Sequence, residues 1–161
     1  MTDFRALLAT LVEHGVDFIL VGGVAATVHG ASRLTRDVDV VYARADANLD
    51  RLVAALARHS PYLRDVPPGL PFRWDCDTLR RGLNFTLTTD VGAIDLLGEI
   101  IGGGRFEDLV AHSIEIELFG LHCRCLGLAK LIEVKRAAGR PRDLEAVAEL
   151  EAIREERGGS G

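Results

Sequence analysis

The sequence predicts an α+β fold in which helices flank a mixed β-sheet and two helices end the chain. Apolar residues recur at helical spacing in some stretches and at alternate positions in others, without a regular strand–helix–strand rhythm. The chain has 161 residues, of which 48% are hydrophobic, which is enough for one core of ordinary size. We expect residues 1–157 to form a single domain and residues 158–161, Gly-Gly-Ser-Gly, to be a flexible tail or cloning remnant.

The first part of the chain alternates helical and extended patterns. Apolar residues at i, i+3, i+4, i+7 and i+8 from Phe4 predict an amphipathic helix that Thr2 or Asp3 caps and that ends at Gly15. The same spacing predicts a helix after Asp46, which is placed to cap it. Between these two helices the expected elements are, in order, a buried strand at 16–21, a short helix at 24–29 and a strand at 38–42.

The second part of the chain opens on an irregular stretch. Residues 61–82 hold four of the five prolines and no clear period, so we expect a loop that includes one short strand. Pro141 suits the first turn of a final helix because its φ is fixed at a helical value. The expected elements are, in order, a hairpin of strands at 83–87 and 93–97, a flexible glycine link at 102–104, strands at 114–118 and 121–126, and helices at about 127–138 and 141–156.

Composition and charge exclude several classes of protein. The formal net charge of −5 argues against a general DNA-coating protein. No apolar run approaches the ~20 residues of a membrane span. Three cysteines are an odd number, which argues against a disulfide framework. We therefore expect a cytoplasmic protein with no membrane contact.

Three carboxylates stand where strands are expected. Asp37 and Asp39 share one face because alternate residues of a strand point the same way, and two like charges there repel unless a cation lies between them. Asp95 stands in an otherwise apolar strand and needs a partner, because an unpaired buried carboxylate is costly. Together they predict a site for a hard divalent cation such as Mg²⁺. In the alternative interpretation Asp37 caps a turn, Asp39 pairs with Arg36 and Asp95 faces water.

Two further features point to an anionic ligand. The Gly22-Gly23 pair ends the first strand and opens a short helix, where backbone N–H groups can approach an anion closely. Lys135 lies near the middle of the apolar arc of the penultimate helix, where a lysine either extends to the rim or meets an anion. Arg33 and Thr35 lie between the glycines and the first two aspartates.

The combined motif resembles the signature of the nucleotidyltransferase superfamily, which has the DNA polymerase β-like fold. The matching positions are Gly22, Gly23, Gly30, Arg33, Thr35, Asp37, Val38 and Asp39, with Asp95 in the place of the third carboxylate. The stretch 131–144 looks like the tail of small bacterial members, which include minimal nucleotidyltransferases and the transferase toxins of abortive-infection and toxin–antitoxin systems. The resemblance spans roughly residues 16–150, and many members have Ser where this chain has Gly23.

The resemblance implies an enzyme that transfers a nucleoside monophosphate from an NTP, ATP included, to an acceptor and releases pyrophosphate. Two Mg²⁺ ions, or Mn²⁺ in their place, would clamp the attacking and leaving oxygens. The catalytic and metal-binding residues would be Asp37, Asp39 and Asp95. The nucleotide-binding residues would be Gly22, Gly23, Arg33, Thr35 and Lys135.

The acceptor and the partners stay open at this point. A tRNA end, a protein hydroxyl and a small-molecule hydroxyl are all candidate acceptors. The chain is short for the superfamily, so we expect an antitoxin or a second copy of the chain to complete the site. The alternative function is a non-catalytic module on the same fold that binds a nucleotide or a partner.

Two features near the C-terminus have an ordinary structural interpretation beside the functional one. The segment 124–142 carries six basic residues and one acid, which suits either contact with a polyanion or a solvated face. Asp143 stands in the first turn of the last helix, where we expect it to cap that helix.

Overall fold

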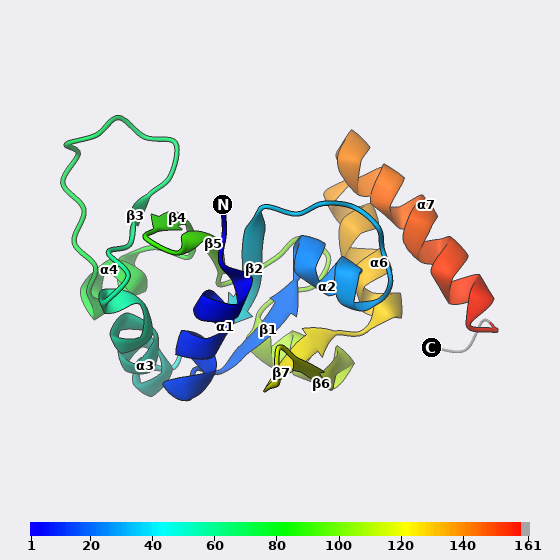
Figure 1. Ribbon diagram of the computed structural model, residues 1–161, viewed down its shortest axis with the longest axis horizontal. Helices are drawn as coiled ribbons and strands as arrows, with labels where there is room; N and C mark the ends of the chain where they lie inside the picture. The colour runs from blue at the N-terminus through cyan, green and yellow to red at the C-terminus, as the bar shows by residue number, and fades with distance from the viewer. Residues whose placement is uncertain (159–161) are drawn as a thin grey trace.

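The computed structural model, shown in Figure 1, describes residues 1–158. Most of the expected tail, residues 159–161, lies outside the described residues. The strands form one mixed sheet in the order β3-β4-β5-β2-β1-β7-β6. The strands are β1 (Phe18–Val21), β2 (Asp37–Tyr42), β3 (Tyr62–Leu63), β4 (Asn84–Thr89), β5 (Gly92–Leu97), β6 (Ser113–Leu118) and β7 (Leu121–Leu126).

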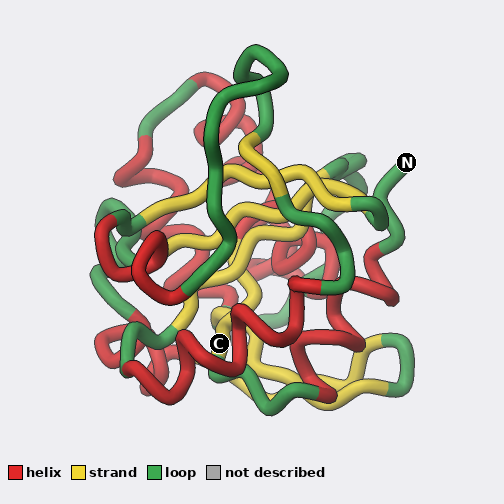
Figure 2. Tube along the Cα trace, turned by 90° about the vertical axis from the view of Figure 1, so that its left-hand side faces the viewer, coloured by secondary structure: helices red, strands yellow, loops and turns green. Residues whose placement is uncertain are grey.

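Helices pack around this sheet, and Figure 2 shows the strands running through the middle of the molecule with helices about them. The helices are α1 (Phe4–Glu13), α2 (Gly22–Val28), α3 (Asp46–Ala57), α4 (Cys76–Arg81), α5 (Phe106–Leu109), the 3₁₀ helix η1 (Val110–His112), α6 (Leu128–Ala138) and α7 (Pro141–Glu156). Helix α1 packs on α3, α2 packs on α6, and α6 packs on α7. The predicted α+β class, the mixed sheet and the two C-terminal helices are confirmed.

The middle of the sheet is its most buried part because strands flank it on both sides. In the centre, β2 runs parallel to β5 and antiparallel to β1, and β1 runs parallel to β7. All four residues of β1 are buried, and so are the last three of β2. Tyr42 is fully buried, and its hydroxyl donates a hydrogen bond to the backbone oxygen of Leu83 at 2.8 Å. These packed strands give the start of β2 a fixed position.

The structure differs from the expected elements in three places. Helix α4 lies in the stretch expected to be loop, where Asp75 caps it by accepting from the Thr78 backbone N–H at 2.8 Å. The four-residue helix α5 was not expected at all. Asp46 is the first residue of α3 and not its cap, which is Ala45. The 3₁₀ helix η1 was not expected either, and all three missed helices are too short for an apolar period to show.

Two further aspects of the fold bear on the site. Helix α2 begins directly at Gly22, two residues before its expected start, so the glycine pair is its first turn. Between β3 and α4 a long loop extends away from the sheet, as Figure 1 shows. No helix in residues 1–158 has the length and apolar character to cross a membrane.

Candidate functional site

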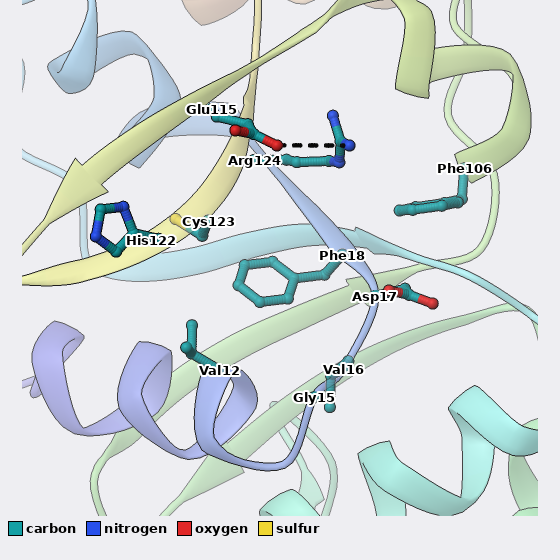
Figure 3. A pocket seen from close by; sticks show the side chains of 10 residues that line it. All are labelled: Val12, Gly15, Val16, Asp17, Phe18, Phe106, Glu115, His122, Cys123 and Arg124. Carbon is teal, nitrogen blue, oxygen red and sulfur yellow. Dashed lines mark ion pairs between the residues drawn. The ribbon is translucent and has the colours of Figure 1, made fainter.

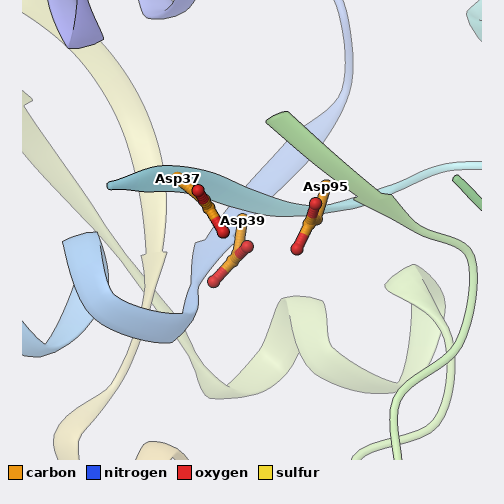
Figure 4. A group of neighbouring side chains, drawn as sticks. All are labelled: Asp37, Asp39 and Asp95. Carbon is orange, nitrogen blue, oxygen red and sulfur yellow. The ribbon is translucent and has the colours of Figure 1, made fainter. Parts of the chain in front are cut away.

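The pairing register of three adjacent strands brings the predicted aspartates together. In β2, Asp39 lies opposite Val21 of antiparallel β1 and opposite Asp95 of parallel β5. Asp37 precedes Asp39 by two residues, so both side chains project from the same face of the strand. Figure 4 shows the three carboxylates gathered on one side of these strands. We call Asp37, Asp39 and Asp95 the Asp triad.

The Asp triad has the composition and spacing of a metal site. One carboxylate oxygen from each residue lies within 4.8 Å of the other two, and no other group of three His, Cys, Asp or Glu side chains in residues 1–158 does so. The Oδ1 atom of Asp39 is buried and has no hydrogen-bond partner in the described part of the chain. Hard divalent cations prefer carboxylate oxygens. The residues present therefore fit a divalent metal ion.

Burial and neighbouring negative charges shift the acidity of Asp39. Burial, followed by the negative charges of Asp95 and Asp37, raises the pKa of Asp39 from 3.8 to about 7, and Lys135 opposes the shift. A bound cation favours the ionised carboxylate, so binding a metal and losing the Asp39 proton assist each other. The site holds more negative charge than the fold alone neutralises.

Arg64 belongs to this site although no sequence pattern predicted it. Its guanidinium pairs with Asp95 and reaches Asp37 Oδ2 at 3.5 Å, and its side chain is 19% exposed. Its Nη1 donates to the Leu87 backbone oxygen at 2.9 Å. Arg64 follows β3 in the aperiodic, proline-rich stretch. The one available signal was indirect, since a carboxylate in the position of Asp95 needs a partner.

The predicted glycine turn lies directly against the Asp triad. Gly22 has a φ of +67°, and a Cβ atom there would collide with the carboxylate of Asp39. A Cβ atom at Gly23 would lie 2.5 Å from Thr35 Oγ1, and the Thr35 hydroxyl donates to the Asp37 backbone oxygen at 3.2 Å. The local fold thus excludes side chains from both glycines and brings Thr35 to the site.

A cavity of about 430 Å³ opens beside the Asp triad, between the sheet and helices α6 and α7. Its volume falls within the usual range of small-ligand sites. Only Asp39 of the triad lines it. The residues that line it are Val21, Gly22, Asp39, Asn84, Leu97, Glu99, Ile100, Ile101, Leu131, Val134, Lys135, Ala138, Arg140 and Asp143.

Lys135 brings an ammonium group to this cavity. No hydrogen bond or ion pair to its side chain is present within residues 1–158, and burial lowers its pKa, while Asp143 and Asp39 favour its charged form. The apolar residues of its arc on α6, Leu131 and Val134 among them, line the same cavity. The helical period therefore placed Lys135 on the correct side of α6.

Asp143 and Arg33 have partners in α7. Asp143 is 4% exposed and accepts from the Arg140 backbone N–H at 3.2 Å and from Arg140 Nε at 2.6 Å, which is the expected capping role. Arg33 pairs with Glu145 at 3.0 Å on the surface. The structure thus brings seven of the eight predicted site residues to the Asp triad or its cavity, and it places Arg33 on α7 instead.

The basic segment 124–142 is largely paired with acids. Four of its six basic residues form ion pairs, which favours the solvated-face interpretation over a free polyanion surface. The pairs are Arg124–Glu115, Lys130–Glu133, Arg136–Glu151 and Arg140–Asp143.

A second cavity, of about 420 Å³, contains none of the predicted site residues. Figure 3 shows the side chains that line it, which come from the end of α1, from β1, from α5 and from the β6–β7 hairpin. His122 and Cys123 stand on its wall, whereas Cys125 is fully buried in the core. Its charged wall residues are already in ion pairs, Arg124 with Glu115 at 3.8 Å and Asp17 with Arg51 at 3.6 Å. This cavity therefore offers no comparable chemistry.

Comparison with solved structures identifies the fold. The lincosamide antibiotic adenylyltransferase LnuA with lincomycin bound has a TM-score of 0.61 at 14% identity, covering 94% of this chain and 98% of that one. A putative nucleotidyltransferase from Thermotoga maritima has a TM-score of 0.53 at 12% identity, covering 99% and 97%. ANT(2″)-Ia in complex with adenylyl-2″-tobramycin has a TM-score of 0.52 at 14% identity, covering 94% and 92%. The fold is that of the nucleotidyltransferases.

The family follows from the sequence itself. Residues 5–120 match the family model described as nucleotidyl transferase AbiEii toxin, type IV TA system. The match spans more than half of the chain, which therefore belongs to the AbiEii family and is a nucleotidyltransferase. A search of the curated proteins found no match. The family agrees with the resemblance inferred from the glycine pair and the three aspartates.

Proposed function

We propose that the chain is a Mg²⁺-dependent nucleotidyltransferase that moves a nucleoside monophosphate from an NTP to a hydroxyl acceptor. The observation that carries this proposal is the Asp triad beside a cavity that also holds the Lys135 ammonium group, which has no hydrogen bond or ion pair within residues 1–158. Carboxylates that can bind a metal ion therefore lie beside the same cavity as a lysine that can bind phosphate. Phosphoryl-type transfer requires mainly charge neutralisation and alignment, and this arrangement supplies both.

Each residue has a role in that reaction. Asp37, Asp39 and Asp95 would hold the metal, which when bound neutralises the triphosphate and activates the attack. Lys135 would contact phosphate oxygens from α6. The bare backbone of Gly22 and Gly23 would let the phosphates approach the triad.

The bonds that change follow from the substrate. The acceptor oxygen forms a bond to the α-phosphorus while the bond from that phosphorus to the bridging oxygen breaks, and pyrophosphate leaves with the bonding electrons. Asp95 would orient the acceptor hydroxyl and accept its proton as the new bond forms. We propose two metal ions, Mg²⁺ in the cell with Mn²⁺ able to replace it.

The acceptor and the partner are parts of the same proposal. Membership in a toxin family favours a cellular acceptor, tRNA or protein, and an antitoxin as the partner that restrains the enzyme. Two structural neighbours carry antibiotics in their names, so a small-molecule hydroxyl belongs among the acceptors to be tested. We also propose that residues 1–157 form a single domain. The proposed location is the cytoplasm, because free thiols such as the three here persist there.

The test is transfer of label from each of the four NTPs. The full chain is incubated with α-labelled NTP and Mg²⁺, with tRNA, cell protein, or a lincosamide and an aminoglycoside as acceptor. We expect label on one acceptor class and release of pyrophosphate, both abolished in Asp39→Asn. Asp46→Asn, an exposed aspartate paired with Arg80, is the matched control and should retain full transfer. Nucleotide binding without transfer in any arm would favour the binding-module alternative and overturn the enzymatic role.

A further inference from the structure

The guanidinium of Arg64 lies against carboxylate oxygens of the Asp triad, the same group of side chains that could hold a metal ion. It forms an ion pair with Asp95 and lies 3.5 Å from Asp37 Oδ2, so it bridges two members of the Asp triad. Asp39 takes no part in this contact, and its Oδ1 has no hydrogen-bond partner among the described residues. Arg64 therefore neutralises one side of the triad and leaves the other side open.

The Arg64 guanidinium and a divalent cation would compete for the negative charge of the same carboxylates. The ligand atoms of the triad lie within 4.8 Å of one another, so an ion bound to all three would stand within a few ångströms of the Arg64 charge. Like charges at that separation repel strongly where water is largely excluded. The Arg64 side chain is 19% exposed and that of Asp95 is 23% exposed, so solvent screens the repulsion only in part.

The backbone of Arg64 is held at the edge of the sheet, where its N–H donates to the Thr86 backbone oxygen at 2.9 Å, so any movement is that of the side chain. Arg64 directly follows β3, a two-residue strand at the edge of the sheet, and begins the loop that extends from the body of the protein in Figure 1. Its Nη1 is held by the Leu87 backbone oxygen, whereas Nη2 carries the contacts with both aspartates. Rotation of the guanidinium can release Asp95 and Asp37 while the side chain stays near β4.

We propose that Arg64 is the resident cation of the metal-free site, and that a divalent metal must displace its guanidinium from Asp95 and Asp37 to bind. Arg64 then has two opposite effects: it stabilises the metal-free fold and it weakens the apparent affinity for metal. The inference rests on the proposed function only in requiring that the Asp triad binds metal.

The test measures Mn²⁺ binding and stability on the full chain after removal of metal with EDTA and dialysis. Free Mn²⁺ is followed by electron paramagnetic resonance for the wild type, Arg64→Gln, Arg64→Lys, Asp39→Asn and Arg58→Gln. Arg58 is the matched control because it pairs with Glu13 at 3.4 Å, outside the triad. Melting temperatures are recorded with EDTA and with saturating Mn²⁺. No step depends on enzymatic turnover.

We expect Arg64→Gln to bind Mn²⁺ about tenfold more tightly than the wild type, since a charged hydrogen bond that opposes binding is removed. Arg64→Lys keeps the positive charge but on an ammonium group, so its Mn²⁺ affinity should lie between those of the wild type and Arg64→Gln. If Arg64→Gln does not fold, the comparison of Arg64→Lys with the wild type provides the test. Arg58→Gln should bind like the wild type. The melting temperature of Arg64→Gln should lie further below that of the wild type in EDTA than in saturating Mn²⁺.

Two results would overturn the proposal, and they are distinguishable. If the wild type binds Mn²⁺, Asp39→Asn does not, and both Arg64 variants bind no more tightly than the wild type, Arg64 is a structural residue and the metal site stands. If neither the wild type nor the Arg64 variants bind Mn²⁺, the metal site of the proposed function fails as well. Binding by the Arg64 variants alone would support the proposal in its strongest form.

Discussion

At the scale of single residues, Asp39 couples the site to pH. Its pKa is about 7 in the folded chain against 3.8 for the free group, so the folded state binds more protons than the unfolded state between these values. The stabilising contribution of protonated Asp39 is thus fully present below about pH 4 and is lost as the pH rises through 7. At neutral pH the metal-free triad is a source of instability.

The corresponding prediction concerns Asp39→Asn in EDTA. The amide removes the charge that the fold disfavours, so the variant should melt at least about 2 °C above the wild type at pH 8. The difference should shrink toward pH 4, as measured by thermal unfolding across that range. A difference that does not depend on pH would contradict the shift, and in saturating Mn²⁺ the order of the two proteins should reverse.

Gly22 shows how little space the site leaves. Its φ of +67° favours glycine, and a Cβ atom would collide with Asp39. Gly15 is a matched control because its φ is +68° and its nearest neighbour, in Arg51, would lie at an ordinary 3.7 Å.

We predict that both Gly22→Ala and Gly15→Ala lose the roughly 1–2 kcal/mol that a left-handed conformation costs. Only Gly22→Ala should also lose Mn²⁺ binding, because the added methyl group displaces the Asp39 carboxylate. Chemical denaturation and Mn²⁺ titration measure the two effects separately. Equal metal binding by the two variants would show that the close approach of Gly22 to Asp39 has no consequence for the site.

At the scale of elements, α6 should contribute to phosphate binding through Lys135 and not to metal binding. Lys135 lines the cavity without a partner in residues 1–158, whereas Lys130 on the same helix pairs with Glu133 at 3.0 Å. Lys135→Met should weaken nucleotide binding about tenfold and leave Mn²⁺ affinity within twofold. Lys130→Met should change neither. Calorimetric titration with a non-hydrolysable NTP measures the nucleotide affinity of both variants. If Lys135→Met also loses Mn²⁺ affinity, Lys135 supports the metal site and its role is not confined to phosphate binding.

Helix α7 supports α6 through one buried leucine and exposes another. Leu150 is fully buried, while Leu144 is 50% exposed. Leu150→Ala should lower the free energy of unfolding by about 2–5 kcal/mol, because the cavity it leaves cannot close completely. Leu144→Ala should change it by about 0.5 kcal/mol or less. Urea denaturation of the two variants tests the difference, and similar losses would mean that α7 packs otherwise than described.

The elements also show what the sequence could predict. Strands β1, β2, β4, β5, β6 and β7 and the long helices were expected because each has an apolar run or a clear period. Helix α4 has a single buried residue, Leu79, so no period could reveal it. Among site residues, the aspartates and Gly22 followed from local patterns. Arg64 did not, because only the fold brings the end of β3 over the triad. The pairing of Arg33 with Glu145 had no local signal either, because Glu145 lies 112 residues away.

At the scale of the whole molecule, the site depends on contacts between distant parts of the chain. Asp39 and Asp95 become neighbours only when β2 and β5 pair in parallel, and Lys135 arrives only with α6. Contacts of such long range form late in folding. Mn²⁺ should therefore slow unfolding and leave the refolding rate unchanged, which stopped-flow measurements with and without the ion will test. A faster refolding rate would mean that the triad forms before the rate-limiting step.

The pairing of Val21, Asp39 and Asp95 across three strands has a consequence for synthesis of the chain on the ribosome. A chain still being synthesised has no triad until β5 has left the ribosome and found β2, and its cavity lacks a wall until α6 follows. An unfinished copy that ends before β5 therefore lacks the metal site altogether. In this member of the AbiEii family, the order of the strands along the chain thus delays assembly of the triad until β5 has been made.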